Sequence, residues 1–293
     1  MEANKIDLIE TIEHLKPSLK PPVSNSMLFN DALKVMVVGG PNQRKDFHIE
    51  MGQELFYQYQ GDMDLVIMHP STQRPEAIRI KEGEVFLLPA GIPHSPQRYA
   101  DTIGVVFERD RLTGEVDCLR WYNGESEGFS IQYEEFLFCA DLGTQIKQAI
   151  ERWQAHMAQG GDFDKAREPA LPVVGLVHCM EAASRLPPLI PPFGLRTFLN
   201  THIGETVSTI FQSEFQLVAY RGSMEGPVTH TVALVPTHRE VFLWQLEGLA
   251  MLKLKVNLVL NYLWPIIAIL GLFMDKSNSK IITLNTVPIS LTS

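Results

Sequence analysis

The sequence predicts a mainly β protein, an antiparallel barrel or sandwich with a few peripheral helices. The first observation is a series of short runs rich in Val, Ile and Phe between Leu33 and about Tyr122, each ended by turn residues. The second is that EVFLWQLEG (240–248) echoes QELFYQYQG (53–61). Such an echo indicates an internal repeat of one β unit.

The predicted strands follow one another closely along the chain. Their sequences are LKVMVVGG, ELFYQYQG, DLVIMHP, AIRIKEG, EVFLLPAG and TIGVVFERD. Each run is about the length of one strand, and Gly, Pro or Asp stands at or just after its end. This spacing is typical of antiparallel strands joined by tight turns.

Two segments have helical spacing instead. Residues 6–16 carry apolar side chains on one face before Pro17, which predicts a short amphipathic helix. Residues 144–158 repeat the pattern before the glycine pair at 160 and 161, so we expect a helix that lies across a sheet. Its apolar face consists of Ile146, Ile150, Trp153 and Met157.

The chain is predicted to contain two domains. Residues 1–164 form the catalytic domain, residues 165–194 a linker that ends in the proline-rich PPLIPPFG, and residues 195–293 a degenerate second domain. Aligning the repeated segments puts Val235 and Val241 where His48 and Glu54 stand in the first copy. The second copy is therefore expected to hold no metal.

Composition excludes some functions. A net charge of −9 without a run of basic residues argues against nucleic acid as a partner. The three cysteines, at 118, 139 and 179, form no CxxC pair and leave an odd thiol, so neither a disulfide framework nor a cysteine zinc site is expected. With an N-terminal segment, MEANKIDLIE, that shows no secretory signal, we expect a protein of the cytosol.

One segment is unusual for a β domain. Residues 256–274 are free of charge and long enough to cross a bilayer as a helix. Asn257, Asn261 and Pro265 weaken that interpretation, and the expectation is no membrane contact. The alternative, a membrane-anchored binding protein, stays open at this point.

Two motifs bring together side chains of the kind that bind a metal. His48 and Glu54 are separated by an even number of residues, so a strand with an intervening turn can point both inward. In GEVFLLPAGIPHSPQR (83–98) a strand runs into a turn that delivers His94. Each residue alone would be taken for an ordinary core or surface side chain. Together, two imidazoles and one carboxylate make the facial triad of Fe(II) oxygenases.

The motifs resemble the two signatures of the cupin superfamily. His48, Glu54 and Gly61 fit the first, with Glu50 in place of its second histidine, and Gly83, Pro89, Gly91 and His94 fit the second. Among cupins the chain resembles the 3-hydroxyanthranilate 3,4-dioxygenase family from about Lys20 to Asp164. This likeness is carried by PPVSN (21–25), GGPNQRKDFH, EMGQELFYQYQGDM, GEVFLLPAGIPHSPQR and VFERDR (106–111).

The resemblance implies a site and a reaction. It implies a bicupin of jelly-roll type with Fe(II) as cofactor, held by His48, Glu54 and His94. It further implies substrate contacts at Arg44, Glu54, Arg98, Glu108 and Asn25, with Arg44 and Glu108 also catalytic. The implied reaction inserts both atoms of O₂ into 3-hydroxyanthranilate to give 2-amino-3-carboxymuconate semialdehyde. That product cyclises to quinolinate, on the kynurenine route from tryptophan toward NAD.

Several alternatives remain at this level. Without the resemblance, Arg44 would be a solvated arginine, Arg98 a rim ion pair and Glu108 a strand-end carboxylate. A cupin without dioxygenase activity, such as an isomerase, an epimerase or a metal-binding protein, is a rival because fold alone does not determine function. Another is an inactive form altered in the tail after Gly248. Lacking the CxxC of bacterial relatives, the chain is expected to hold no second iron and to be a monomer.

Overall fold

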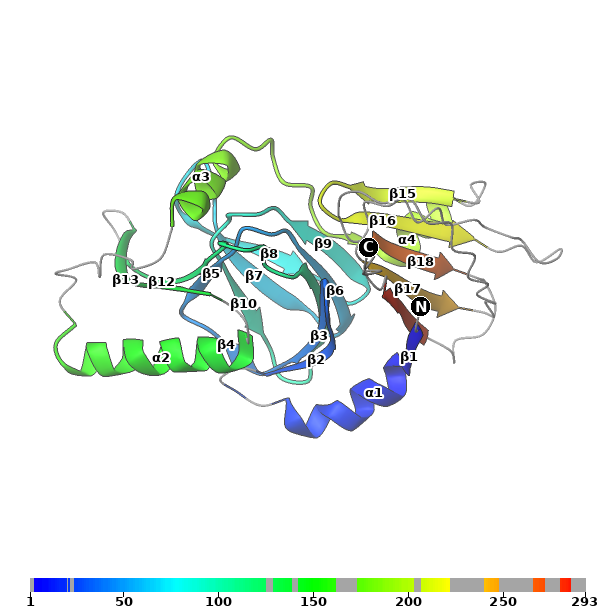
Figure 1. The fold of residues 1–293 in the computed structure, drawn as a ribbon, viewed down its shortest axis with the longest axis horizontal. Coiled ribbons are helices and arrows are strands. Elements are labelled where there is room, and N and C mark those ends of the chain that lie inside the picture. The colour runs from blue at the N-terminus through cyan, green and yellow to red at the C-terminus, as the bar shows by residue number, and fades with distance from the viewer. Residues whose placement is uncertain are drawn as a thin grey trace, which may run out of the picture. The chain divides into compact units, whose positions relative to one another are not determined.

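The protein was analysed as a computed structural model, shown in Figure 1, in which two compact units can be distinguished. The jelly-roll unit contains Pro17–Leu28 and Lys34–Leu195, and the C-terminal unit contains Met1–Lys16, Phe29–Leu33 and Arg196–Ser293. The structure describes residues 3–19, 21, 24–124, 129–138, 142–161, 173–202, 207–221, 240–247, 266–271 and 280–285. The domain limits drawn from the sequence, with catalysis assigned to residues 1–164, remain a prediction.

The strands of the jelly-roll unit form two sheets. In order, the first contains β13 (Ser130–Leu137), β12 (Asp117–Asn123), β5 (Phe47–Ile49), β10 (His94–Arg98), β7 (Met63–Met68) and β8 (Pro75–Ile80), with β4 (Asn42–Gln43) beside β10. The second contains β14 (Phe193–Gly194), β9 (Glu84–Leu88), β6 (Glu54–Gln60), β11 (Ile103–Arg109), β3 (Leu33–Gly39) and β2 (Asn25–Asn30). The mainly β, jelly-roll prediction is confirmed, but these sheets stay separate and do not close into one hydrogen-bonded barrel.

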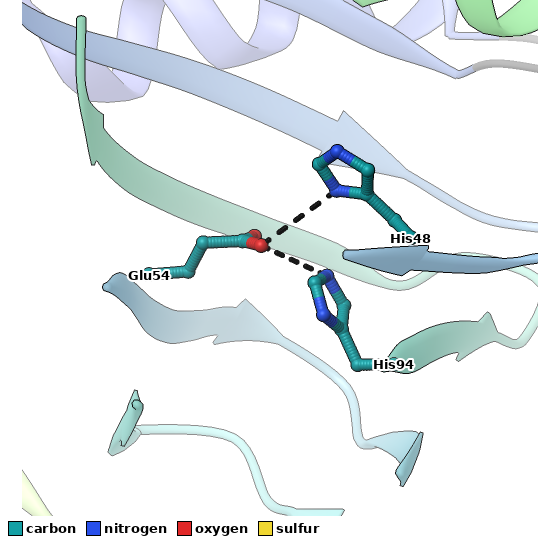
Figure 2. Close-up of side chains that lie close together, drawn as sticks. All are labelled: His48, Glu54 and His94. Atoms are coloured by element: carbon teal, nitrogen blue, oxygen red, sulfur yellow. Dashed lines mark ion pairs between the residues drawn. The ribbon is translucent and has the colours of Figure 1, made fainter. Parts of the chain in front are cut away.

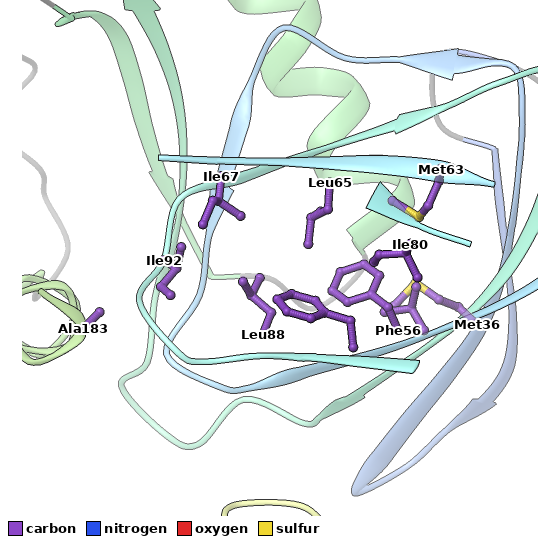
Figure 3. Packing of buried hydrophobic residues seen from close by; sticks show 11 residues of the cluster. Met36, Phe56, Met63, Leu65, Ile67, Ile80, Leu88, Ile92 and Ala183 are labelled. Atoms are coloured by element: carbon purple, nitrogen blue, oxygen red, sulfur yellow. The ribbon is translucent and has the colours of Figure 1, made fainter. Parts of the chain in front are cut away.

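A buried apolar cluster joins the two sheets face to face (Figure 3). Met63, Leu65 and Ile67 point inward from β7, while Phe56 of β6 and Leu88 of β9 point inward from the opposite sheet. Side chains two apart on a strand share a face, which is why alternate residues of β7 enter this core. Fully burying each such side chain contributes about 1.5–3 kcal/mol. The cluster therefore holds the two sheets at the spacing that the site requires.

Both predicted helices are present. The helix α1 (Leu8–Leu15) starts at Asp7, whose carboxylate accepts from the backbone N–H of Glu10 at 3.1 Å. The helix α2 (Leu142–Ala158) ends before Gly160, as expected. Its Ile146 and Ala149 pack on β12 and β13, which confirms that this helix lies across a sheet.

Two of the described α-helices, α3 (Val174–Ala183) and the short α4 (Leu195–Thr201), were not predicted. The helix α3 has buried residues only at Leu176 and Ala183, so its apolar spacing is too weak to mark a helical face in the sequence. It packs against the turn that precedes His94. A Cβ on Gly91, which has a φ of +76°, would lie 2.8 Å from the backbone of Cys179 in α3. Glycine is thus required here both for the turn and for the close approach of the helix.

The described strands of the C-terminal unit form one six-stranded sheet. Its order is β1 (Ala3–Asp7), β19 (Lys280–Asn285), β17 (Glu240–Glu247), β18 (Ile266–Gly271), β16 (Gln216–Arg221) and β15 (Val207–Gln212), and the unit also contains α4 (Leu195–Thr201) at its start. The strand β18 runs parallel to both of its neighbours, and Glu240–Glu247 of the repeated segment form β17. That the unit is a degenerate cupin stays a prediction, and Val235 lies outside the described residues.

The apolar segment 256–274 is described only at Ile266–Gly271, where it forms β18 and not a helix. Across the described part of the chain, none of the helices combines the length and the apolar character that a membrane span needs.

Candidate metal centre

The three predicted ligand residues come together between the two sheets (Figure 2). His48 of β5 and His94 of β10 pair directly across neighbouring strands of one sheet. Glu54 begins β6 in the opposite sheet. Two imidazoles therefore approach from one wall and one carboxylate from the other, which surrounds a common point with ligand atoms.

The distances at this point are short. His94 Nε2 lies 2.8 Å and His48 Nδ1 3.8 Å from Glu54 Oε1, and all three side chains are buried. Despite this proximity, Glu54 Oε1 accepts no well-aligned hydrogen bond from the described residues. A buried carboxylate oxygen without a donor is costly, whereas a cation between it and two imidazole nitrogens satisfies all three groups. The donor set thus fits a divalent metal ion.

Each imidazole is oriented through its other nitrogen. His48 Nε2 lies 2.9 Å from Asp117 Oδ2, and His94 Nδ1 lies 3.0 Å from the carbonyl oxygen of Ile92. Because each of these acceptors takes the ring proton, the second nitrogen keeps a lone pair directed at Glu54. Outer partners of this kind are typical of histidines that bind a metal.

Within the triad, Glu54 and His94 each shift the pKa of the other toward its charged form. Burial alone would raise the pKa of Glu54, but the neighbouring His94 and His48 lower it overall. Burial would lower the pKa of His94, whereas the charge of Glu54 raises it. At neutral pH the centre therefore contains an anionic carboxylate, which favours a bound cation.

A buried arginine links the centre to a cluster of carboxylates. Arg111 forms ion pairs with Glu50, Glu108 and Asp117, and its Nε donates to Asp117 Oδ1 at 3.1 Å. Burial opposes its charge, but these carboxylates raise the pKa of Arg111 well above its ordinary value. Burial and the other carboxylates raise the pKa of Glu50, although Arg111 opposes this. Arg111 thus holds in place both Asp117, the partner of His48, and Glu108.

Arg98 lies fully buried and has no ion-pair partner among the described residues. Its Nη1 donates to Gln58 Oε1 at 3.2 Å, and its Nε has no partner although it is buried. Burial lowers the pKa of Arg98 to about 10, against an opposing effect of Glu54. The guanidinium remains charged at neutral pH and is available to an anionic group.

The other residues predicted to contact substrate have partners within the chain. Arg44 pairs with Asp46, and its Nε donates to Asp46 Oδ1 at 3.1 Å. Its positive charge acts on His94, whose pKa it lowers, so Arg44 lies within electrostatic range of the triad. Glu108 pairs directly with Glu54 across β11 and β6. Asn25 Nδ2 contacts Met36 Sδ at 3.9 Å, at the side of the core.

Three residues of the site escaped sequence reasoning. Arg111 stands within VFERDR, but nothing local shows that it is buried among carboxylates. Asp117 is far from His48 in sequence and carries no motif. Gln58 was detectable, because it stands four residues after Glu54 and a continuous strand puts both on one face.

Two buried histidines and a carboxylate enclosed by a jelly roll define the class of metal-dependent cupins. The comparisons with known proteins identify the family within this class. The chain belongs to the 3-hydroxyanthranilic acid dioxygenase family, a family of enzymes whose model matches residues 1–154.

Relatives in vertebrates extend the match beyond the first domain. The 3-hydroxyanthranilate 3,4-dioxygenase of Xenopus laevis is 40% identical over 254 residues, which cover 84% of this chain and 83% of the relative. Those of Rattus norvegicus and Homo sapiens are each 38% identical over 248 residues, covering 81% of this chain and 79% of each relative. The similarity therefore includes most of both chains.

Proposed function

We propose that the protein is a 3-hydroxyanthranilate 3,4-dioxygenase with Fe(II) at His48, Glu54 and His94. The observation that carries the proposal is the buried Glu54 Oε1, which faces two imidazole nitrogens and accepts no well-aligned hydrogen bond from the described residues. Fe(II) held by these residues would supply open coordination positions for an aminophenol and O₂. The family match agrees with this choice of reaction.

Arg98 binds the carboxylate of the substrate in this proposal. Its fully buried guanidinium has no carboxylate partner among the described residues, and its planar fork can bind a carboxylate through two parallel hydrogen bonds. Binding at this point determines which edge of the aromatic ring faces the metal centre.

Glu108 and Arg44 act on the groups that react, one by accepting a proton and the other by stabilising charge. Glu108 stands beside Glu54 across the strand pair, where its carboxylate can accept the proton that the substrate hydroxyl loses. Arg44, within electrostatic range of His94, stabilises negative charge that develops on oxygen. Asn25 provides a lesser polar contact to the substrate.

In the reaction, the ring bond between carbons 3 and 4 breaks and both atoms of O₂ enter the product, 2-amino-3-carboxymuconate semialdehyde. Cyclisation of this product gives quinolinate, which places the step between tryptophan and NAD. We propose that the enzyme works in the cytosol as a monomer, without nucleic acid or membrane as partner. The acidic net charge and the lack of a CxxC pair for a second iron support this part of the proposal.

Reconstitution under nitrogen tests the proposal. The purified chain is loaded with Fe(II), mixed with 3-hydroxyanthranilate and exposed to air, and the near-ultraviolet absorbance of a muconate semialdehyde is followed together with O₂ consumption. We expect one O₂ consumed per substrate, and no signal from protein loaded with Zn²⁺. Full iron loading without absorbance or O₂ uptake would show that the proposed activity is wrong.

A further inference from the structure

The inner face of the jelly roll carries two layers of functional side chains. On the paired strands β6 and β11, Glu54 stands opposite Glu108, and Gln58 stands opposite Gly104 four residues further along. On β10 of the facing sheet, His94 and Arg98 have the same separation of four. Because residues two and four apart on a strand share a face, the metal layer is followed by a second layer. That second layer consists of Arg98, Gln58 and Gly104.

The second layer is closely packed around one guanidinium. A Cβ on Gly104 would lie 2.6 Å from Arg98 Nη1 and 2.8 Å from Gln58 Oε1. Real Cβ atoms do not approach that closely, so the missing side chain provides the space in which Arg98 meets Gln58. Gly104 is therefore required for space rather than for backbone conformation.

The orientation of the Gln58 amide is determined by a second contact. Gln58 Nε2 donates to the carbonyl oxygen of Gln60 at 3.2 Å, which turns Oε1 toward Arg98. Gln58 is 1% exposed and Arg98 is 1% exposed, so water does not compete for this contact. The amide thus holds the guanidinium in one place.

Three arginines near the centre, Arg44, Arg98 and Arg111, have different partners. Arg44 pairs with one carboxylate and Arg111 with three, so their charges are compensated within the chain. Arg98 contacts a neutral amide and keeps a buried Nε without a partner. A neutral acceptor can position a guanidinium without neutralising it, which a carboxylate at the same place cannot do.

From these contacts we infer that Gln58, supported by Gly104, is the positioning residue that selects ring substrates carrying a carboxylate. It fixes the guanidinium of Arg98 and leaves the whole positive charge for one anionic group of the ligand. The inference rests on the proposed function in taking that group to be the carboxylate of 3-hydroxyanthranilate. Selectivity over the same ring without a carboxylate then depends on the neutrality of residue 58.

The substitution Gln58→Glu tests this directly, since it replaces the amide by a carboxylate of almost the same shape. The new carboxylate pairs with Arg98 and competes with the substrate. We expect the KM for 3-hydroxyanthranilate to rise about 10- to 100-fold, with kcat changed less than threefold. The inhibition constant of 2-aminophenol is expected to stay within about twofold. This ligand lacks the carboxylate, so it does not compete with Glu at position 58 for the guanidinium of Arg98.

Gln60→Glu is the matched control, because it makes the same change two residues along β6. The Gln60 side chain is only half-buried and donates to the backbone of Asp101, away from Arg98. This control is expected to bind both ligands as the wild type does. Equal losses of 3-hydroxyanthranilate and 2-aminophenol affinity in Gln58→Glu would overturn the inference, and so would no loss at all.

Two further variants keep the test usable if Gln58→Glu does not fold. Gly104→Ala forces the guanidinium aside, and Gln58→Met removes the acceptor without adding charge. Each is expected to weaken 3-hydroxyanthranilate binding about 3- to 10-fold and to leave 2-aminophenol unaffected. Wild-type selectivity in both variants would contradict the inference.

Calorimetric binding of anthranilate under nitrogen separates this inference from the proposed function, because it needs no turnover. Suppose that the wild type binds anthranilate but does not open the ring of 3-hydroxyanthranilate, and that Gln58→Glu weakens anthranilate binding about tenfold or more. The inference then stands while the proposed function fails. If the wild type opens the ring but anthranilate binds equally to both proteins, the inference alone fails.

Discussion

Asp117 Oδ2 and His48 Nε2 lie 2.9 Å apart, although the two residues are 69 positions apart in the sequence. Both side chains are buried, and Asp117 is itself held by two contacts from Arg111. The nearby Arg111 and His48 lower the pKa of Asp117 despite its burial, so it is ionised at neutral pH. An anionic partner on one imidazole nitrogen makes the other a stronger ligand.

Asp117→Asn is therefore expected to lower metal affinity about 10- to 100-fold, because the amide is uncharged and also offers a donor where an acceptor is needed. Competition with a chelator of known affinity measures this. Asp101→Asn is the control, since Asp101 is exposed and its φ of 59° suits asparagine. Equal affinities in Asp117→Asn and the control would show that Asp117 does not act on the metal centre.

Glu54→Gln is expected to abolish iron retention. The substitution preserves side-chain shape but removes the anionic ligand, and an amide between two imidazoles cannot replace it. Iron content after gel filtration gives the measurement, with Glu84→Gln, at a half-buried position on β9, as the matched control. If Glu54→Gln retained one iron per chain, Glu54 would not be a ligand and the proposed metal triad would be wrong.

Arg98→Met is expected to make the protein more stable and to prevent substrate binding. Burial lowers the pKa of Arg98 to about 10 from 12.5, so the charged form opposes folding at neutral pH by an amount on the order of 3 kcal/mol. Methionine fills similar space without charge. Urea denaturation and substrate titration, done on the same preparation, test the two effects.

A loss of stability in Arg98→Met would mean that an interaction within the chain already compensates the charge of Arg98. Iron content serves as the internal check, because the variant is expected to retain its metal while the KM for 3-hydroxyanthranilate rises about 100-fold or more.

Glu50→Gln is expected to raise the free energy of unfolding by about 1 kcal/mol at pH 7. Burial and neighbouring carboxylates raise the pKa of Glu50 in the folded state, so its ionised form opposes folding at pH 7. As the pH falls through this raised pKa, the wild-type carboxyl takes up a proton and comes to resemble the amide. The difference in stability between variant and wild type is thus expected to shrink as the pH falls through the raised pKa and to vanish below the ordinary value of 4.5.

Asp117→Asn is expected to change the free energy of unfolding in the opposite direction at pH 7, that is, to lower it. Its pKa is lowered in the folded state, so its ionised form contributes stability that is complete above its ordinary value of 3.8 and is lost as the pH falls below it. Denaturant curves of both variants between pH 4 and 7 test the pair together. The same sign for both at pH 7 would show that Arg111 does not discriminate between these carboxylates.

Much of the site could be predicted from the sequence. The motif spacing identified His48, Glu54 and His94, and local runs of apolar residues identified most strands around them. These signals are local: alternation marks a strand, a glycine marks its turn, and each histidine stands at a fixed spacing from these within one short motif. The helix α2 was equally visible, because its apolar face repeats every three to four residues.

Tertiary structure decided which charges compensate one another. Arg44 and Arg98 look alike in sequence, yet among the described residues one pairs with Asp46 and the other with the neutral amide of Gln58. That difference depends on strand register across two facing sheets and on the space left by Gly104. Arg44 and Asp46 are only two residues apart, but Arg98 and Gln58 are 40 apart, and pairing between such distant strands is a collective result of packing. The sequence by itself thus determined the residue types of the candidate centre and their strands, while the three-dimensional fold decided which arginine keeps its charge for a ligand.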